Sequence, residues 1–437
     1  MRTISLVVLL AGLAAADEVP QVEWASTWEA AFRQAKDEGK PVLVCINSKD
    51  GEQANETTAK EIYHDPLFVA LSRKFVMVLV STREHAKTGP CPRFGKVTCA
   101  EHLRCWEDLN AACGETFVVP GSGGDMISPQ HAWFAPDGRL LRRKEYLLDK
   151  EELMRRMRAT LAELGTGGAT PGAPGPLEDK ERAEFERLKG ATDREARTAA
   201  LGNLLATEKA AVHEALVALL VATKDAALKG DILRALASAQ VAAARPAAER
   251  LLTDGDTLMR SVAAVSLEIL ADKEAVPALL KRARAEDDPA ARKNVCRALG
   301  ACGGPAADKA AAKALLDAVG GDKQKMVCKH AALALRGFAG AGAALVRKKL
   351  EQAVLRTKDP EVRRGIVYAL AFVGDAKTTV PVLEKALAEE HEEWAQNFVL
   401  SAIGRVKGVA AAGENDPFAE AARWLFWEDS QDPARGG

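Results

Sequence analysis

The chain has 437 residues, enough for two or three domains, and its 60 basic and 61 acidic side chains leave a formal net charge of −1. A balance this close to neutral gives no broad positive field, so neither nucleic acid nor anionic lipid is expected as a partner. Aromatic residues make up only 5%, and alanine is abundant in the second half, which favours closely packed helices over a β-rich core.

The first residues have the pattern of a secretory signal. Arg2 precedes an apolar stretch over 4–14, and a run of three alanines ending at Ala16 is followed by two acidic residues. We therefore expect a signal peptide over 1–16 and a periplasmic or secreted protein. The apolar stretch is too short to span a bilayer comfortably and no later segment is apolar enough, so no membrane span is predicted.

The segment 22–164 predicts an α/β layered unit. Two continuous apolar runs are typical of strands buried on both faces, and a Pro-Asp-Gly turn later joins two strands of a hairpin. Helical patterns precede, separate and follow these strands. In chain order we expect a helix over 24–38, a strand over 41–46, a helix near 55–63, a strand over 75–80, a hairpin over 130–146 and a helix over 149–164. A β-α-β unit followed by a hairpin is an α/β fold.

This segment resembles the thioredoxin-like superfamily, and in particular its exported branch. The resemblance rests on Lys40-Pro41-Val42-Leu43-Val44, on Ser128-Pro129 and on Pro136-Asp137-Gly138. It implies a thioredoxin-like domain over 17–164. It also implies a cis peptide bond before Pro129, because the family has a cis-proline beside its active site.

The chain departs from the family at the active site itself. Redox-active members carry Cys-x-x-Cys where the loop after the first strand enters a helix, and the helix N-terminus lowers the pKa of the first thiol. An ungapped alignment from Lys40 to Phe68 places Glu52 and Asn55 at these degenerate active-site positions. Neither residue can form a thiolate, and we expect both to cap the helix. No catalytic residue is predicted.

Residues 81–125 form an insertion that contains Cys91, Cys99, Cys105 and Cys113. Three interpretations compete: disulfides that staple a long exported loop, a metal site, and a displaced redox site or unpaired thiols. In the metal interpretation the soft ligands would be Cys99, His102 and Cys105, completed from Cys91, Cys113, His85 and His131.

Helix geometry restricts the disulfides. In one helix over 98–113, Cys99 and Cys113 would be roughly 21 Å apart at a rise of about 1.5 Å per residue, which is beyond disulfide reach. Cys91 in the preceding loop is therefore expected to pair with one of the helical cysteines. The spacing lacks the paired Cys-x-x-Cys of a zinc ribbon, so no metal ligand and no cofactor is predicted.

A Gly- and Pro-rich linker over 165–177 leads into a sequence that repeats every 31 to 36 residues. One apolar position recurs in register seven times, with apolar residues three positions later. These anchor positions are Leu201, Leu236, Leu267, Leu299, Leu335, Leu370 and Ile403. Seven residues before them stand basic or polar residues, except for Cys328.

The repeats resemble HEAT-like helical hairpins over 178–410, stacked as an α-solenoid. The family's Asp-then-Arg spacing occurs in Asp256…Arg260, Asp288…Arg292 and Asp359…Arg363. The resemblance implies that these side chains form a ladder between neighbouring repeats. Residues 411–437, with Phe418 and Trp424-Leu425-Phe426-Trp427, are expected to cap the open end of the stack together with Trp394.

The predicted function is an exported, non-catalytic interaction scaffold. It would bind another protein through the solenoid and through an inactive thioredoxin-like platform. The alternative is an extracytoplasmic thiol–disulfide oxidoreductase or a metal-dependent protein that uses the insertion. A lyase role on a tetrapyrrole would rest on fold analogy alone. The sequence identifies no small-molecule ligand.

Overall fold

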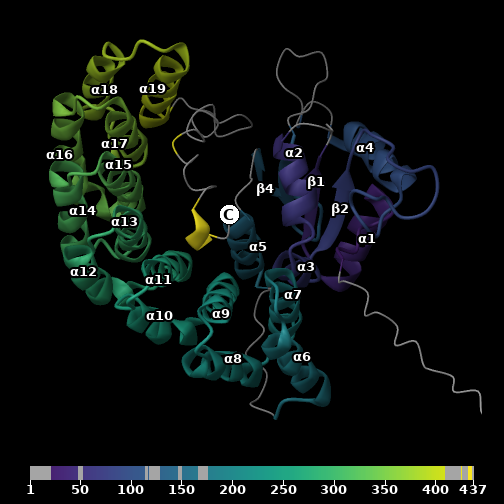
Figure 1. Cartoon of the computed structure of the whole chain (residues 1–437). Coiled ribbons are helices and arrows are strands. Elements are labelled where there is room, and N and C mark those ends of the chain that lie inside the picture. The colour runs from purple at the N-terminus through teal and green to yellow at the C-terminus, as the bar shows by residue number, and fades with distance from the viewer. Residues whose placement is uncertain are drawn as a thin grey trace, which may run out of the picture.

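A computed structural model describes residues 21–47, 53–113, 117, 128–145, 150–165, 176–408, 425 and 432–435. The expected signal peptide, Glu52, most of the linker and most of the segment 411–437 lie outside these residues. Figure 1 shows a sheet-containing unit beside a curved array of helices.

The sheet has four strands in the order β2-β1-β3-β4. Strand β1 pairs parallel to β2 and antiparallel to β3, and β3 pairs antiparallel to β4. The strands are β1 (Val42–Ile46), β2 (Val76–Val80), β3 (Gln130–Phe134) and β4 (Leu140–Glu145). The β-α-β unit and the hairpin thus occur at the expected residues, while membership of the thioredoxin-like superfamily stays a prediction.

Helices cover both faces of this sheet, which is why β1 and β2 are continuous apolar runs. Val42 and Val44 face Ala31 and Ala35 of α1, whereas Leu43 and its neighbours on the other face belong to a second buried cluster. The helices are α1 (Trp28–Glu38), α2 (Gln53–Thr57), a π-helical turn (Thr58–Ile62), α3 (Pro66–Ser72), α4 (Cys99–Cys113) and α5 (Lys150–Glu163). Helix α4 packs beside α1 and β2.

Residues 176–408 form seven helical hairpins stacked side by side in an α-solenoid (Figure 1). The hairpins are α6 (Asp179–Gly190) with α7 (Arg194–Leu205), α8 (Ala210–Ala222) with α9 (Ala226–Ser238), α10 (Arg245–Leu251) with α11 (Thr257–Leu270), α12 (Val276–Ala285) with α13 (Pro289–Gly303), α14 (Lys309–Gly321) with α15 (Lys325–Ala334), α16 (Ala343–Arg356) with α17 (Pro360–Val373), and α18 (Thr379–Leu387) with α19 (Glu393–Val406). The odd-numbered helices from α9 to α19 line the concave side of the arc.

All seven anchor positions are buried, as a stack of hairpins requires. In five repeats, the residue seven positions before the anchor makes the same hydrogen bond. Its side chain donates to the backbone carbonyl of the residue six positions earlier in the sequence. The bonds run from Arg260 to Asp254, from Arg292 to Glu286, from Cys328 to Asp322, from Arg363 to Thr357 and from Gln396 to Glu390. Cys328 therefore keeps the bond of the arginine it replaces, through its S–H group at 3.3 Å.

The aspartates and arginines of the Asp-then-Arg spacing have different roles. The aspartates cap their own helices, since Asp288 accepts from Ala291 N at 2.9 Å and the others do likewise. The arginines pair with other acids of the next hairpin: Arg260 with Glu286, Arg292 with Asp322 and Arg363 with Glu390. A ladder between neighbours is thus present for these arginines, but its acids are not the aspartates of the motif.

The sheet-containing unit and the array are in direct contact through α3 and α7. Lys74 forms an ion pair of 2.5 Å with Glu208, and buried apolar residues of both parts belong to one continuous cluster. A Cβ atom at Gly202 would lie 2.2 Å from the Cβ of Pro66. Glycine at this position lets the two helices approach closely.

We expect Gly202→Ala to lower the free energy of unfolding by about 1–3 kcal/mol, because the added methyl group overpacks the junction with Pro66. Urea denaturation would measure the loss. Gly190→Ala is the matched control, since nothing lies within 4 Å of its added Cβ. Equal effects of the two substitutions would show that the junction tolerates a side chain.

The expectation that the C-terminal segment caps the open end is wrong for its described part. Asp432 and the short 3₁₀ turn Pro433–Arg435 lie against α11 and α13, in the middle of the array and far from α19 (Figure 1). Their charges find partners there, as described below. Trp394 does lie in the last hairpin, where the guanidinium of Arg364 stacks on its ring at 4.4 Å.

Within the described residues, no helix combines the length and the apolar character needed to cross a membrane.

Candidate functional site

One of the two degenerate active-site positions, Asn55, makes a buried polar contact. Asn55 lies inside α2, and its Nδ2 donates to Ser128 Oγ at 3.3 Å. The Ser128–Pro129 peptide bond, for which the resemblance implied a cis conformation, is cis. A residue in the middle of a helix is not its N-cap, so the expected capping role of Asn55 is wrong; Glu52 lies outside the described residues.

Five of the described thiols lack the features of a reactive cysteine. Burial raises the pKa of Cys45, Cys105, Cys296 and Cys302 to about 12, and it also raises the pKa of Cys328. A nucleophilic or redox-active thiol needs a lowered pKa and access to solvent. Among the described cysteines none is in a disulfide.

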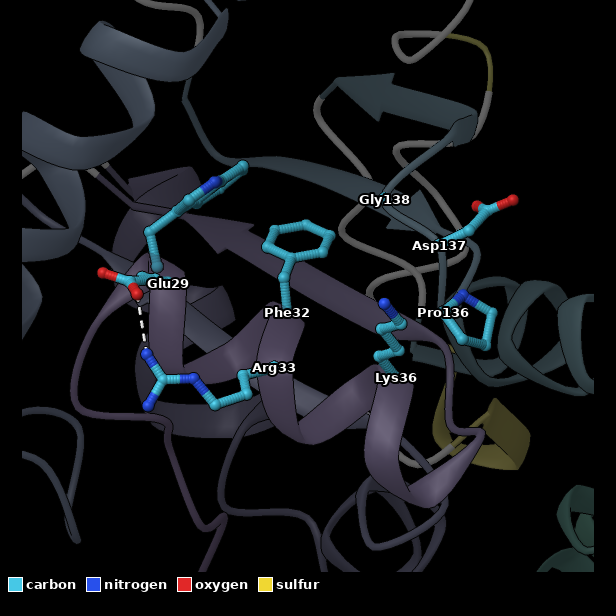
Figure 2. A pocket seen from close by; sticks show the side chains of 8 residues that line it. Glu29, Phe32, Arg33, Lys36, Pro136, Asp137 and Gly138 are labelled. Carbon is cyan, nitrogen blue, oxygen red and sulfur yellow. Dashed lines mark hydrogen bonds and ion pairs between the residues drawn. The ribbon is translucent and has the colours of Figure 1, made fainter.

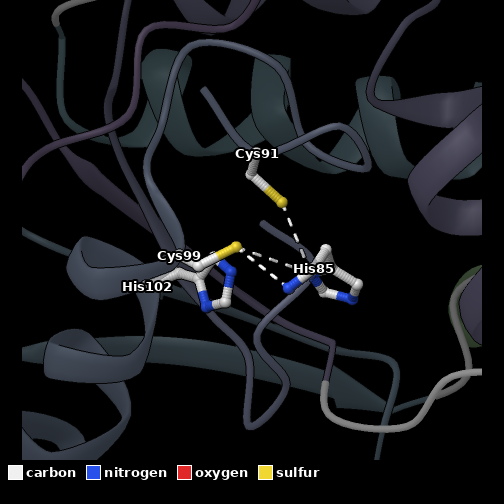
Figure 3. Close-up of side chains that lie close together, drawn as sticks. All are labelled: His85, Cys91, Cys99 and His102. Atoms are coloured by element: carbon white, nitrogen blue, oxygen red, sulfur yellow. Dashed lines mark hydrogen bonds between the residues drawn. The ribbon is translucent and has the colours of Figure 1, made fainter. Parts of the chain in front are cut away.

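The structure brings together only part of the metal-ligand set considered from the sequence. His85, Cys91, Cys99 and His102 place their ligand atoms within 4.8 Å of one another (Figure 3). Cys105 instead packs among the apolar residues between α4 and the sheet. Burial lowers the pKa of His131 to about 3, and this neutral ring contacts the Tyr63 hydroxyl at 3.2 Å. The side chain of Cys113 lies outside the described part of the chain.

A surface hollow lies between α1 and the turn of the hairpin (Figure 2). Phe32 forms its floor, and Glu29 and Arg33 form an ion pair of 2.6 Å at one side. Its polar side chains are exposed and belong to one helix and one turn. The hollow therefore offers apolar contact but no converging reactive groups.

On the concave face of the array, a group of charged and amide side chains contacts the C-terminal segment of the chain. We call this group the tail-binding patch. It consists of Glu268 on α11 and Lys293, Asn294 and Arg297 on α13. The patch holds the C-terminal segment Asp432–Arg435, which we call the tail. These four residues come from the C-terminal end of the sequence, and Asp432 is 138 positions after Asn294.

The two charges of the tail are recognised separately. Lys293 Nζ lies 2.7 Å from Asp432 Oδ2, and the two side chains are only 4% and 6% exposed. Arg435 Nη2 lies 2.5 Å from Glu268 Oε2. Glu268 Oε1 also lies 3.0 Å from Arg297 Nη2, so this carboxylate is held by α13 as well as by the tail.

Asn294 contacts both ends of the tail at once. Its Nδ2 donates to Asp432 Oδ2 at 2.9 Å, and its Oδ1 accepts from Arg435 Nη2 at 3.3 Å. The side chain of Asn294 is fully buried. The amide group of Asn294 therefore forms hydrogen bonds with an acidic and a basic side chain that are three residues apart in the tail.

The tail also organises itself for this contact. Asp432 Oδ1 accepts from Ala434 N at 2.9 Å, and the Asp432 carbonyl accepts from Arg435 N at 2.9 Å. This tight turn presents the acidic and basic side chains on one side. Burial alone would raise the pKa of Asp432, but the hydrogen bonds from Lys293 and Asn294 hold it below its ordinary value. The aspartate is therefore bound as a charged carboxylate.

A known family model matches the repeat array. Residues 213–300 and 312–404 match the family model of HEAT repeats, so the array contains HEAT repeats. No curated protein matches the chain. A solved structure of the complex of CpcE and CpcF of phycocyanin lyase from Nostoc sp. PCC7120 is similar at 22% identity and a TM-score of 0.32, over 55% of this chain and 98% of that chain.

Proposed function

We propose that this protein is an exported interaction scaffold that binds peptide segments of other proteins on the concave face of its HEAT repeats. The observation that supports this most directly is the tail in its patch, where α11 and α13 already hold a peptide by its side chains. The preferred partner segment carries an acid followed three residues later by a base. In this chain the tail occupies the patch in cis.

The contacts of the patch have the features of a recognition site rather than of a chance surface contact. Exposed ion pairs contribute little, but a charge pair that is desolvated and also hydrogen-bonded is costly to break. Lys293 and Asp432 are such a pair, and Asn294 completes it. HEAT arrays present long concave surfaces of this kind.

The proposal also covers the sheet-containing unit. Its degenerate active-site positions and its buried thiols favour a binding or structural role over thiol–disulfide exchange. We further propose that this unit is an inactive thioredoxin-like platform and that the mature protein is periplasmic or secreted.

A peptide-binding experiment tests the scaffold function. The full chain with Asp432→Ala and Arg435→Ala should leave its patch open, and a labelled synthetic peptide of residues 428–437 should then bind to it in fluorescence anisotropy. Adding Lys293→Ala should weaken binding by about 2 kcal/mol or more, which is roughly thirtyfold in Kd, because the buried aspartate loses its partner.

Lys313→Ala in the same background is the control, since this exposed lysine of α14 forms an ion pair with Asp317 on its own helix and is not part of the patch. The unaltered chain should bind the peptide more weakly than the open variant. Binding that ignores Lys293→Ala, or no binding to the open variant, would contradict the proposed recognition.

A further inference from the structure

We infer that His85, Cys91, Cys99 and His102 form a structural zinc site in the cysteine-rich insertion. This replaces the sequence-based expectation that the chain has no metal ligand. The four residues come from three places: the loop after β2, the tight loop 91–97, and the first turn of α4 (Figure 3). Two thiols and two imidazoles are a ligand set that structural zinc prefers.

The spacing of the ligand atoms fits a tetrahedral ion. Zinc bonds of about 2.0–2.3 Å separate neighbouring ligand atoms in a tetrahedron by about 3.3–3.8 Å. His85 Nδ1 lies 3.4 Å from Cys91 Sγ and 3.9 Å from Cys99 Sγ, and all four ligand atoms are within 4.8 Å of one another. Small side-chain movements would therefore close the cluster around one ion.

Hydrogen bonds with backbone groups orient two of the ligand side chains for a metal ion. The backbone N–H groups of His85 and Ala86 donate to Cys99 Sγ at 3.1 and 3.3 Å, which stabilises a thiolate. His102 Nδ1 lies 3.2 Å from the carbonyl of Ser81. Because a carbonyl only accepts, Nδ1 carries the proton and Nε2 presents its lone pair to the cluster. A backbone carbonyl behind a histidine is a common support of zinc ligands.

The loops hold the cluster closed. Cys91 N donates to the Val97 carbonyl at 2.6 Å, and Gly95 adopts a positive φ of 77° that closes the loop. The rings of His85 and His102 each lie 5.7 Å from the ring of Phe94. Cys91, Cys99 and His102 are buried. Since the protein supplies four ligands in a closed setting, the ion would have a structural rather than a catalytic role.

A zinc ion here would tie down the long insertion, which is the role that the sequence analysis considered for disulfides. It would join the loop that follows β2 to the start of α4, and so fix the insertion to the sheet. A disulfide between Cys91 and Cys99 is the direct competitor, because the same two sulfur atoms cannot serve both. That alternative gives no role to the converging His85 and His102.

Metal analysis of the full mature chain, purified with zinc under mild reductant, tests the site. We expect one zinc per chain. Cys99→Ser and His102→Gln should lose this stoichiometric zinc, whereas Cys105→Ser on the same helix should keep it, because Cys105 faces the sheet. Circular dichroism identifies any variant that fails to fold.

Replacing zinc with Co²⁺ tests the site in the unaltered protein, where no substitution can disturb folding. The Co²⁺ form should show the visible bands of a tetrahedral site with thiolate ligands, and His85→Gln should shift them. A Cys91–Cys99 disulfide in the native, metal-free protein would overturn the inference, and so would zinc retention by Cys99→Ser. The peptide-binding result does not depend on either outcome, since the tail-binding patch lies in the repeats.

Discussion

Replacing Glu286 with alanine is expected to lower the free energy of unfolding by about 3–5 kcal/mol, because it leaves two nearly buried arginines without their shared partner. The side chain of Glu286 is 0% exposed. Arg260 reaches it with two hydrogen bonds of 2.9 and 3.0 Å, and Arg282 adds one of 2.8 Å. Urea denaturation monitored by circular dichroism would measure the change.

The same residue predicts a pH dependence. Burial alone would raise the pKa of Glu286, but the hydrogen bonds from Arg260 and Arg282 outweigh it and hold the pKa at about 2. A lowered folded-state pKa contributes stability above the ordinary value of 4.5, and this contribution is lost as the pH falls from there through 2. Its size is about 3 kcal/mol. In Glu286→Ala this part of the acid-induced loss should disappear.

Glu384→Ala is the control for both measurements. Its side chain is largely exposed and its pairing with Lys407 is loose, at 3.9 Å. We expect its effect to stay within about 0.5 kcal/mol. Similar losses for Glu286 and Glu384 would mean that the buried carboxylate does not hold its neighbours together.

Replacing Phe338 with alanine is expected to cost about 3–5 kcal/mol, because it opens a cavity in a closely packed part of the array. Phe338 is fully buried and ends the 3₁₀ turn Leu335–Phe338 that follows α15. The side chain also supports the next turn, where a Cβ at Gly342 would lie 3.0 Å from its ring. The midpoint of thermal or urea unfolding would report the loss.

Phe372→Ala offers a matched comparison with the same change of side chain. Phe372 is only partly buried, and its ring is covered by the guanidinium of Arg405 at 4.3 Å. We expect a loss of about 1 kcal/mol from reduced burial and the lost cation–π contact. Equal costs for the two phenylalanines would contradict the cavity argument.

The repeats could be predicted because their signal is local and is repeated. Each anchor from Leu201 to Ile403 is apolar in register, and burial of the same face in every hairpin follows from that period. The strands were predictable for a similar reason, since Val42–Ile46 and Val76–Val80 are apolar throughout. The exact partners in the ladder were not, because the motif aspartates cap their own helices instead of meeting the arginines.

The candidate sites depend on contacts that no local pattern contains. The ligand role of His102 was considered from the sequence, but its grouping with His85 and Cys91 follows from how the loop after β2 folds back on α4. The docking of Asp432 and Arg435 on α13 has no periodic signal at all. The buried Lys293 and Asn294 were the available clue, since charged and amide side chains on a packed helix need partners from outside it.

The contact between α3 and α7 has a consequence for how this architecture can change in length. Repeat arrays need their terminal hairpins covered, and here α3 covers the first one through the close approach at Gly202. A longer or shorter relative would therefore gain or lose whole hairpins between α7 and α19 rather than ahead of α7. Each hairpin gained between α13 and α19 would also move the end of α19, from which the chain continues to the tail, away from the tail-binding patch. The number of late hairpins and the length of chain after residue 408 are thus expected to vary together.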